Sequence, residues 1–193
     1  MKILWEKKCC CDIMRENLEG CTKMKILVVV DMQNDFIDGA LGTKEAEGIV
    51  SKVQQKIETY RNKNDVVIFT RDTHFENYLE TQEGKNLPVK HCIKDSFGWQ
   101  ISRKLDVADS TIIDKPVFGS LELAECVSKI ENISEIELVG LCTDICVISN
   151  AFILKSKFPE TLISVDSSCC AGVSPESHNR ALESMKTCQI MIY

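Results

Sequence analysis

Short runs of β-branched and apolar residues recur along this chain with little polar alternation, which is typical of strands buried on both faces. They lie at residues 25–30 (KILVVV), 65–70 (DVVIFT), 110–114 (STIID), 135–141 (EIELVGL), 161–166 (TLISVD) and 188–193 (CQIMIY). Helical stretches are predicted between them, at residues 44–62, 121–130, 144–157 and 175–185. The repeated succession of strand and helix predicts an α/β fold, with a mostly parallel sheet covered by helices on both faces.

The sequence MKIL occurs twice, at Met1 and at Met24, and only the second copy continues into a convincing buried strand. A single domain of residues 24–193 is therefore predicted. Residues 1–23 form a Cys-rich extension that we expect to be poorly ordered, because polar termini without apolar periodicity usually are. A metal cluster in this extension is disfavoured, since three adjacent thiols do not readily surround one tetrahedral ion. The cysteines concerned are Cys9, Cys10, Cys11 and Cys21.

The composition limits the classes of partner. With 44% apolar residues, 27% charged residues and a net charge of -6, the chain has no general electrostatic attraction for nucleic acid or an anionic membrane. No apolar run reaches the roughly 18 to 20 residues needed to span a bilayer, and the amino end lacks the hydrophobic region of a signal peptide. The 11 cysteines are odd in number and lie mostly within apolar patterns, which favours a reducing compartment. We expect a cytoplasmic protein with a small-molecule ligand, no nucleic acid and no membrane.

Reactive side chains follow several of the predicted strands. Ligands of open α/β sheets bind outside the carboxyl ends of the strands. Asp31 ends the first strand, Lys115 follows the third, and Cys146 falls in the first turn of the helix after the fourth. If Thr143 caps that helix, unpaired N–H groups and the helix dipole lower the pKa of the Cys146 thiol. Lys115 then favours the thiolate and Asp31 acts as general base, whereas Cys142 supplies backbone and packing.

A second group of polar residues lies in and just before the long segment 73–104, which breaks the strand-helix rhythm and is predicted to be a functional loop. Asp72 and His74 are followed by Glu83 and His91, and these residue types suit a borderline divalent ion. Spacing alone is equally compatible with a solvated loop that carries scattered polar residues. The third histidine, His178, is predicted to be a surface or packing residue.

Five segments, VVVDMQNDF, TRDTHFENY, HCIKDSFGW, DKPVFGS and GLCTDICV, occur in this order. Together they resemble the nicotinamidase branch of the isochorismatase-like cysteine hydrolases. The resemblance covers essentially all of residues 24–193 and none of the first 23 residues. It implies a three-layer α/β/α sandwich around a six-stranded, mostly parallel sheet.

The resemblance also implies the roles of individual residues. An Asp-Lys-Cys triad falls on Asp31, Lys115 and Cys146. A non-proline cis peptide precedes Cys142, and the backbone N–H groups of Cys142 and Cys146 form an oxyanion hole. Phe36 packs on the substrate ring, and Phe118 is expected to form a second wall.

The family's divalent metal site is implied as well, with zinc expected and iron or manganese as alternatives. Its ion holds the pyridine nitrogen of nicotinamide. Relatives commonly carry Gly-Thr where this chain has Asp95 and Ser96. The implied ligands are Asp72, His74, Glu83 and His91.

The function implied is hydrolysis of nicotinamide, a small-molecule amide, to nicotinate and ammonia through a cysteine thioester, as part of NAD salvage. We also expect a homo-oligomer. The alternatives are another small-amide or ureido hydrolase with the same triad, the isochorismatase reaction, a non-catalytic binding module, and a thiol-redox protein.

Overall fold

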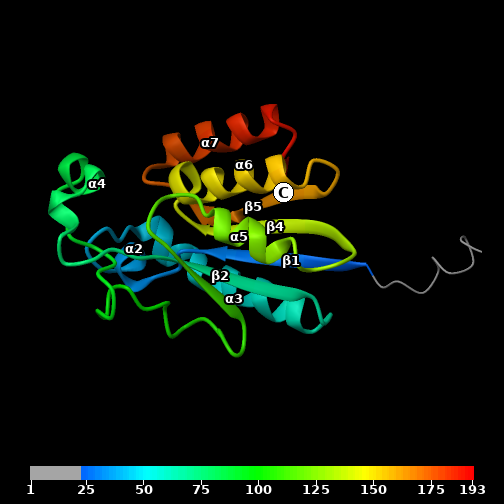
Figure 1. The fold of residues 1–193 in the computed structure, drawn as a ribbon, viewed down its shortest axis with the longest axis horizontal. Coiled ribbons are helices and arrows are strands. Elements are labelled where there is room, and N and C mark those ends of the chain that lie inside the picture. The colour runs from blue at the N-terminus through cyan, green and yellow to red at the C-terminus, as the bar shows by residue number, and fades with distance from the viewer. Residues whose placement is uncertain (1–22) are drawn as a thin grey trace, which may run out of the picture.

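The computed structural model describes residues 23–193, which form a six-stranded, all-parallel sheet between two layers of helices (Figure 1). The strand order is β3-β2-β1-β4-β5-β6. The strands are β1 (Met24–Val30), β2 (Val66–Asp72), β3 (Thr111–Lys115), β4 (Ile133–Leu141), β5 (Leu162–Ala171) and β6 (Met191–Ile192). The predicted three-layer α/β/α fold is confirmed. The predicted extension lies, except for its last residue, outside the described residues.

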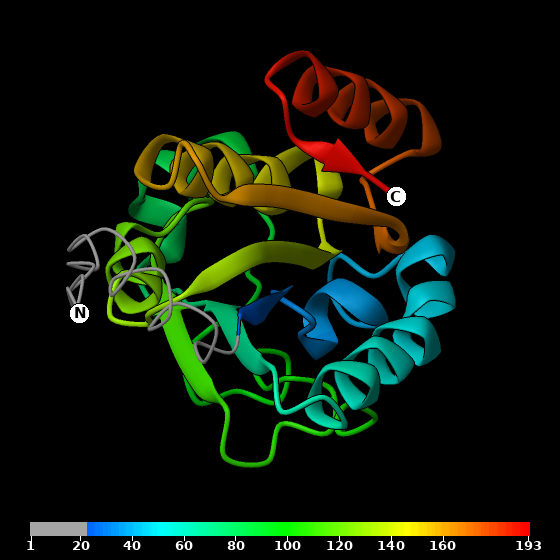
Figure 2. The same cartoon turned by 90° about the vertical axis from the view of Figure 1, so that its right-hand side faces the viewer.

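The helices divide between the two faces of the sheet. The long helix α3 covers one face, and α5, α6 and α7 cover the other, as the two views show (Figures 1 and 2). The helices are α2 (Asn34–Ile37), α3 (Lys44–Arg61), α4 (Gln82–Asn86), α5 (Leu121–Val127), α6 (Ile148–Lys157) and α7 (Pro175–Thr187), with a 3-10 turn η1 (Tyr78–Glu80) and a π-helical turn η2 (Thr143–Val147). No helix in this part of the chain has both the length and the apolar character that crossing a membrane requires.

The run of valines in β1 is explained by burial on both faces. Val28 and Val30 pack into the core under α5, α6 and α7, whereas Leu27 and Val29 pack into the core under α3. All four are fully buried. Each such side chain contributes about 1.5–3 kcal/mol relative to an exposed one. A central strand therefore needs no polar alternation, which is what the sequence shows.

Local signals set the helix boundaries. Thr43 caps α3, and its hydroxyl accepts a hydrogen bond from the Ala46 N–H at 3.0 Å. Ser174 caps α7 in a reciprocal capping box with Ser177, and Pro175 stands at the first position of the helix.

Several predicted boundaries differ from the structure by a few residues, and two of these differences have an identifiable cause. β5 runs five residues beyond its predicted end at Asp166, because its pairing with β4 resumes after an irregularity and joins Gly140 to Cys170. The polar residues that follow Asp166 conceal this continuation in the sequence. The helix predicted over 144–157 begins instead with the π-helical turn, and regular α-helix starts at Ile148.

The carboxyl ends of β1 and β4 approach each other closely. Gly140 has a φ of +114°, and a Cβ there would lie 2.2 Å from the Val30 carbonyl oxygen. Only glycine fits both requirements. Directly after Val30, Asp31 adopts a φ of 48°, which ends the strand and turns the chain. The residues that follow these two strands are thus brought together at one edge.

Candidate active site and metal cluster

The structure brings Asp31, Lys115 and Cys146 together at the carboxyl edge of the sheet. Lys115 is 1% exposed, and its Nζ lies 2.6 Å from Asp31 Oδ2 and 3.4 Å from Cys146 Sγ. Asp31 follows β1, Lys115 ends β3, and Cys146 lies in η2 after β4. Residues more than 100 positions apart in the sequence therefore share one buried site, as proximity in catalysis requires.

The two oxygens of Asp31 differ in their partners. Oδ1 accepts a hydrogen bond from the Thr70 hydroxyl at 2.7 Å. Oδ2 is paired with Lys115 by charge, yet within residues 23–193 it accepts no hydrogen bond of good geometry. Burial raises the pKa of the Asp31 carboxyl, with Lys115 opposing the rise. Oδ2 is thus an available acceptor on a carboxylate that is more basic than usual.

The expected lowering of the Cys146 thiol pKa is wrong. Burial, reinforced by the negative charge of Asp31, raises the pKa of this thiol well above its ordinary value, and Lys115 opposes the rise only in part. The ammonium of Lys115 is already matched by the carboxylate at 2.6 Å. The resting site is therefore a neutral thiol beside an ion pair, and the thiolate forms only as its proton moves to Asp31.

The turn that carries the nucleophile is built differently from the prediction. Thr143 does not cap a helix: the first turned residue follows Cys142, and the Cys142 carbonyl accepts the Val147 N–H at 3.1 Å. The Thr143 hydroxyl is fully buried and lies 2.8 Å from His178 Nδ1 on α7. His178 is therefore a half-buried partner of the nucleophile turn and not a free surface residue.

Cys142 has the backbone geometry that the family resemblance implies. The peptide bond between Leu141 and Cys142 is cis. No acceptor for the Cys142 N–H is found among the described residues, so the group is available to a ligand. Burial raises the pKa of the Cys142 thiol to about 12, which makes it a poor nucleophile.

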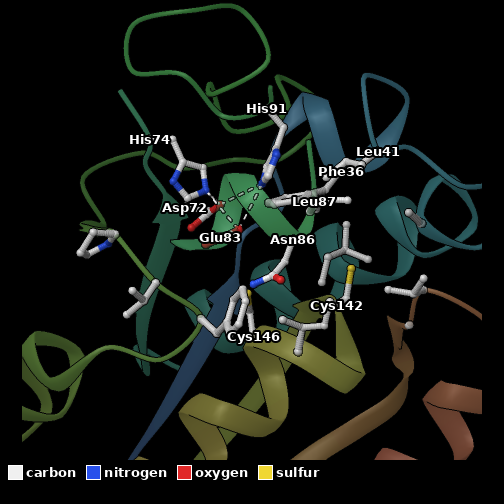
Figure 3. Close-up of a pocket in the computed structure, with 18 of the residues that line it drawn as sticks. Phe36, Leu41, Asp72, His74, Glu83, Asn86, Leu87, His91, Cys142 and Cys146 are labelled. Carbon is white, nitrogen blue, oxygen red and sulfur yellow. Dashed lines mark ion pairs between the residues drawn. The ribbon is translucent and has the colours of Figure 1, made fainter. Parts of the chain in front are cut away.

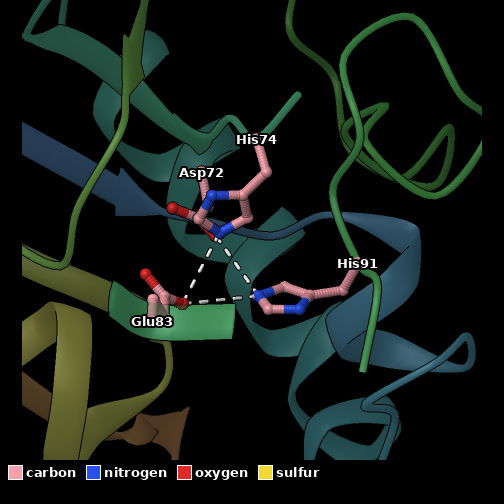
Figure 4. A group of neighbouring side chains, drawn as sticks. All are labelled: Asp72, His74, Glu83 and His91. Carbon is pink, nitrogen blue, oxygen red and sulfur yellow. Dashed lines mark ion pairs between the residues drawn. The ribbon is translucent and has the colours of Figure 1, made fainter. Parts of the chain in front are cut away.

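The four predicted metal ligands also converge (Figure 4). His74 Nε2 lies 2.9 Å from Asp72 Oδ2 and 3.5 Å from Glu83 Oε1. His91 Nε2 lies 3.7 Å from each of the same two oxygens. All four candidate ligand atoms lie within 4.8 Å of one another. We refer to Asp72, His74, Glu83 and His91 as the metal cluster.

Loop pairing explains how the distant histidines meet. His74 N–H donates to the Cys92 carbonyl at 3.0 Å, and Lys94 N–H donates to the His74 carbonyl at 2.8 Å, so the segment after His91 runs beside His74. His91 Nδ1 lies 2.8 Å from the Val89 carbonyl. Because a carbonyl only accepts, Nδ1 must carry the proton, and Nε2 presents its lone pair to the cluster.

The cluster fits a divalent ion. His74 Nε2 is buried close to Asp72 and Glu83, but it makes no hydrogen bond of good geometry with another described residue. Two donors that each bind one zinc ion at about 2.1 Å lie roughly 3.4 Å apart, close to the separations seen here. Burial lowers the pKa of His74, but Asp72 and Glu83 outweigh it and raise the pKa to about 9. The donors thus surround a point that favours positive charge.

The cluster and the triad are physically joined. Lys115 Nζ lies 3.5 Å from Asp72 Oδ1, while Asp72 Oδ2 faces the histidines. Burial alone would raise the pKa of the Asp72 carboxyl, but His74 and Lys115 outweigh it and lower the pKa, so Asp72 stays ionised. One carboxylate therefore stands between the two sets of groups.

A cavity of about 670 Å³ opens beside both groups (Figure 3). The metal cluster and Cys146 line it, and both predicted substrate-binding residues, Phe36 and Phe118, also lie in its wall. The Phe36 ring is 5.5 Å from that of His91, centroid to centroid. The arrangement can hold a flat ring against aromatic walls with one edge at the cluster and a substituent at the thiol.

Three supporting residues were not identified from the sequence. The Gln33 side chain is fully buried, accepts the Asp72 N–H at 2.7 Å and donates to the Asp72 carbonyl at 2.8 Å. The Tyr78 ring is fully buried with its centroid 4.6 Å from His74 and 5.0 Å from His91. An aromatic residue within a polar loop was the feature of the sequence that could have identified Tyr78.

The third supporting residue is Asn150, which is fully buried. It donates to the carbonyls of Cys146 at 2.8 Å and Phe118 at 3.1 Å, and it accepts the Ser120 N–H at 2.9 Å. Asn150 thus connects the turn that carries Cys146 to the segment after Lys115, which forms part of the cavity wall. No pattern in the sequence distinguishes it from other helical asparagines.

Comparison with known proteins agrees with this geometry. A family model described as the Isochorismatase domain matches residues 25–192. A nicotinamidase of Saccharomyces cerevisiae is 24% identical over 214 residues, which cover 88% of this chain and 99% of that protein. A nicotinamidase/pyrazinamidase of Mycobacterium tuberculosis is 25% identical over 183 residues, which cover 86% and 97%.

A solved structure supports the same assignment. The pyrazinamidase of Pyrococcus horikoshii in complex with zinc superimposes with a TM-score of 0.78 at 28% identity, covering 88% of this chain and 98% of that one. The resemblance to the nicotinamidase branch is thereby confirmed.

Proposed function

The chain belongs to the isochorismatase family, and from this premise we propose that it hydrolyses nicotinamide to nicotinate and ammonia. The observation that supports the proposal is that Lys115 connects the triad to the metal cluster. Its Nζ lies close to Asp31, Cys146 and Asp72. A substrate that places its carboxamide at the thiol can place a ring nitrogen at the cluster. The named nicotinamidases and pyrazinamidase among the relatives act on amides of this kind.

In the acylation step, Asp31 Oδ2 takes the proton from the Cys146 thiol as sulfur attacks the carboxamide carbon. Charge that develops on the carbonyl oxygen is held by the N–H groups of Cys142 and Cys146, and each such donor is worth roughly 3 kcal/mol. Lys115 stays protonated and offsets the charge of the carboxylate or the thiolate. Asp31 then gives the proton to the departing nitrogen, the C–N bond breaks, and ammonia leaves.

The thioester is cleaved by the reverse use of the same groups. Asp31, ionised again, takes a proton from water as the water oxygen attacks the acyl carbon. The C–S bond breaks and the Cys146 sulfur recovers a proton. Nicotinate leaves with the oxygen that came from water, so the reaction consumes one water for each amide.

The residues that would hold a divalent ion are Asp72, His74, Glu83 and His91. We propose zinc, with iron or manganese as alternatives, because two imidazoles and two carboxylates suit all three. When bound, such an ion supplies a Lewis-acid contact for the pyridine nitrogen and so fixes the position of the ring. Phe36 and Phe118 would then exclude water from the ring faces.

The test is to incubate the purified protein with nicotinamide and to measure nicotinate and ammonia, with and without a chelator. We expect equimolar products, and a large fall in rate after chelation that added zinc reverses. Failure of the metal-loaded protein to form nicotinate would remove the proposal. A cytoplasmic location and a place in NAD salvage remain predictions that this assay does not address.

The chief alternative is a hydrolase for another small amide or ureido compound that uses the same triad without the cluster. It predicts that turnover survives chelation. The fully formed cluster favours the metal-dependent reaction. If the substrate did not contact a bound ion, the four convergent ligands would have no role in the reaction. A non-catalytic binding module would show no turnover with any amide.

A further inference from the structure

The candidate active-site cavity is much larger than nicotinamide. A pyridine carboxamide fills roughly 150 Å³, about five water volumes of about 30 Å³ each. The cavity measures about 670 Å³. A ring, a carboxamide and an ion together leave most of this space free.

Part of the cavity extends to the side of Cys146 remote from the metal cluster. The order of strands across the sheet is β2, β1, β4, β5. The cluster begins at Asp72, the last residue of β2, whereas Cys142 follows β4 and Gly172 follows β5. Figure 3 shows the cluster and the Cys142 sulfur on opposite sides of the cavity. The cavity wall also includes Pro116, Val117 and Phe118, which follow β3, so the cavity crosses the carboxyl edge of the sheet from β3 to β5.

Strand spacing gives the length of this path. Adjacent strands lie about 4.8 Å apart, so the ends of β2 and β5 are separated by about 14 Å. The distance from the metal ion, through the ring nitrogen, to the amide nitrogen of nicotinamide is about 7 Å, of which the metal bond accounts for about 2.1 Å. The amide nitrogen therefore stops near β4, about half way along the cavity.

The part of the cavity on the β5 side of Cys146, which we call the distal compartment, includes in its wall Leu41, Ala46, Cys142, Gly172 and Val173. None of these side chains is ionised, since the charged residues of the cavity wall all belong to the metal cluster. Val173 is 60% exposed, so the compartment also opens to solvent. It fits an uncharged, apolar group better than a charged one.

Building on the proposed function, we propose that this enzyme accepts N-substituted carboxamides of nitrogen heterocycles, with an apolar substituent on the amide nitrogen in the distal compartment. An alkylamine is about as basic as ammonia, so the acid that protonates ammonia can also protonate it. The C–S bond forms, the C–N bond breaks, and the amine leaves with the proton from Asp31. Water then releases the same carboxylic acid and restores the thiol.

The experiment compares nicotinamide with N-ethylnicotinamide on the metal-loaded, full-length protein, with nicotinate as the common product. We expect the kcat/KM for N-ethylnicotinamide to lie within tenfold of that for nicotinamide. A second readout is binding: the Cys146→Ala variant should bind the two amides with dissociation constants within tenfold of each other, measured by calorimetry.

Val173→Trp tests the location. The added indole at the open end of the distal compartment should lower the kcat/KM ratio of N-ethylnicotinamide to nicotinamide at least tenfold. Leu41→Trp is a second variant in case the first does not fold. Leu162→Trp, a partly exposed site at the opposite end of β5, is the matched control and should leave the ratio unchanged.

Three results would overturn the inference. If the protein hydrolyses nicotinamide but its kcat/KM for N-ethylnicotinamide is more than 1,000-fold lower, on the order of 4 kcal/mol, the inference is wrong and the proposed function stays intact. A ratio that Val173→Trp and Leu41→Trp do not change would place the substituent elsewhere. Failure to hydrolyse either amide would remove the proposed function together with the inference.

Discussion

Two thiols four residues apart line the same cavity but differ in surroundings. Cys146 Sγ lies 3.4 Å from Lys115 Nζ, whereas no hydrogen bond to the Cys142 sulfur is found within residues 23–193, and Cys142 contributes through its backbone. Burial raises the pKa of both thiols. The difference between them is therefore the presence of Asp31 and Lys115 beside one sulfur, and not an intrinsically more acidic thiol.

Cys146→Ala should reduce nicotinate formation by at least roughly 1,000-fold, because loss of a nucleophile disables the whole catalytic unit. Cys142→Ala should reduce it less than about fivefold, since the N–H donor survives the change. Steady-state kinetics at saturating nicotinamide, with circular dichroism as a check of folding, measures both. A fully active Cys146→Ala variant would rule the proposed mechanism out.

At the scale of elements, the end of β1 organises the metal cluster. Gln33 holds both backbone groups of Asp72, and Asp35 accepts the Cys92 N–H at 2.7 Å directly after His91. Gln33 and Asp35 are therefore not candidate metal ligands themselves, but they position residues that are. The Gln33 hydrogen bonds are buried and the Asp35 hydrogen bond is partly buried, which fixes the ligands before any ion binds.

Gln33→Ala should weaken metal binding by about 10- to 100-fold, because supporting residues of this kind commonly have effects of that size. Competition with a chromophoric chelator measures the affinity directly and does not depend on turnover. Gln100→Ala is the control, a change at another glutamine of the same region for which no hydrogen bond to Asp72 is found within residues 23–193. Unchanged affinity in Gln33→Ala would show that the backbone alone holds Asp72.

A second group of charges fastens α3 to the sheet away from the site. Lys56 on α3 lies 2.9 Å from Glu137 on β4 and 2.7 Å from Asp166 on β5. The Tyr60 hydroxyl donates to Glu137 at 2.5 Å. Burial alone would raise the pKa of Asp166, but hydrogen bonds from Lys56 and Ser168 outweigh it and lower the pKa.

Lys56→Met should lower the free energy of unfolding by about 2 kcal/mol at pH 7, less than the 3–5 kcal/mol of a fully buried pair because Lys56 is partly exposed. The folded-state pKa of Asp166 is depressed, so its contribution is present above the unfolded value of about 3.9 and is lost as pH falls through the folded value. The variant should therefore lose less stability than the parent on acidification below pH 4.

Urea unfolding at pH 7 and thermal unfolding from pH 6 to pH 3 measure both effects. Lys157→Met is the matched control, because Lys157 pairs with Glu125 at 2.7 Å on the exposed surface. Because both side chains are exposed to solvent, that pair should contribute much less to stability than the pairs of Lys56. Equal losses in the two variants would contradict the account of α3 docking.

At the scale of the whole molecule, the sheet order decides which groups meet. β1 and β4 are central, with β2 and β3 on one side and β5 and β6 on the other. The base and the nucleophile therefore follow adjacent central strands, and the metal cluster stands beside them after β2. The same order places the distal compartment towards β5.

The predicted domain of residues 24–193 contains all of these groups, and we propose that it folds alone. A chain that begins at Met24 should keep its melting temperature within about 2 °C and its kcat/KM for nicotinamide within twofold, because β1 begins at Met24 and the family match at residue 25. Calorimetry and steady-state kinetics measure these values. A loss of stability would assign residues 1–23 a structural role, and sedimentation of both chains would test the predicted homo-oligomer.

The sequence alone determined the fold class and the identity of the candidate site residues. Strands buried on both faces must be apolar throughout, as Val28 and Val29 show, and this pattern can be recognised in the amino-acid sequence. The motifs that resemble a known family marked the triad and the four ligands by type and order. Such signals are local or compositional, so they are present in the sequence without the tertiary structure.

Only the tertiary structure decided the distances, the protonation state and the shape of the cavity. Thr143 reads as a helix cap, but its buried hydroxyl pairs with His178 on a distant helix. The Cys146 thiol is expected to be acidic from its place after a strand, but burial beside Asp31 raises its pKa. Local pattern records which groups a segment carries, whereas desolvation and charge pairing depend on which segments pack around it, and that is fixed only when the sheet assembles.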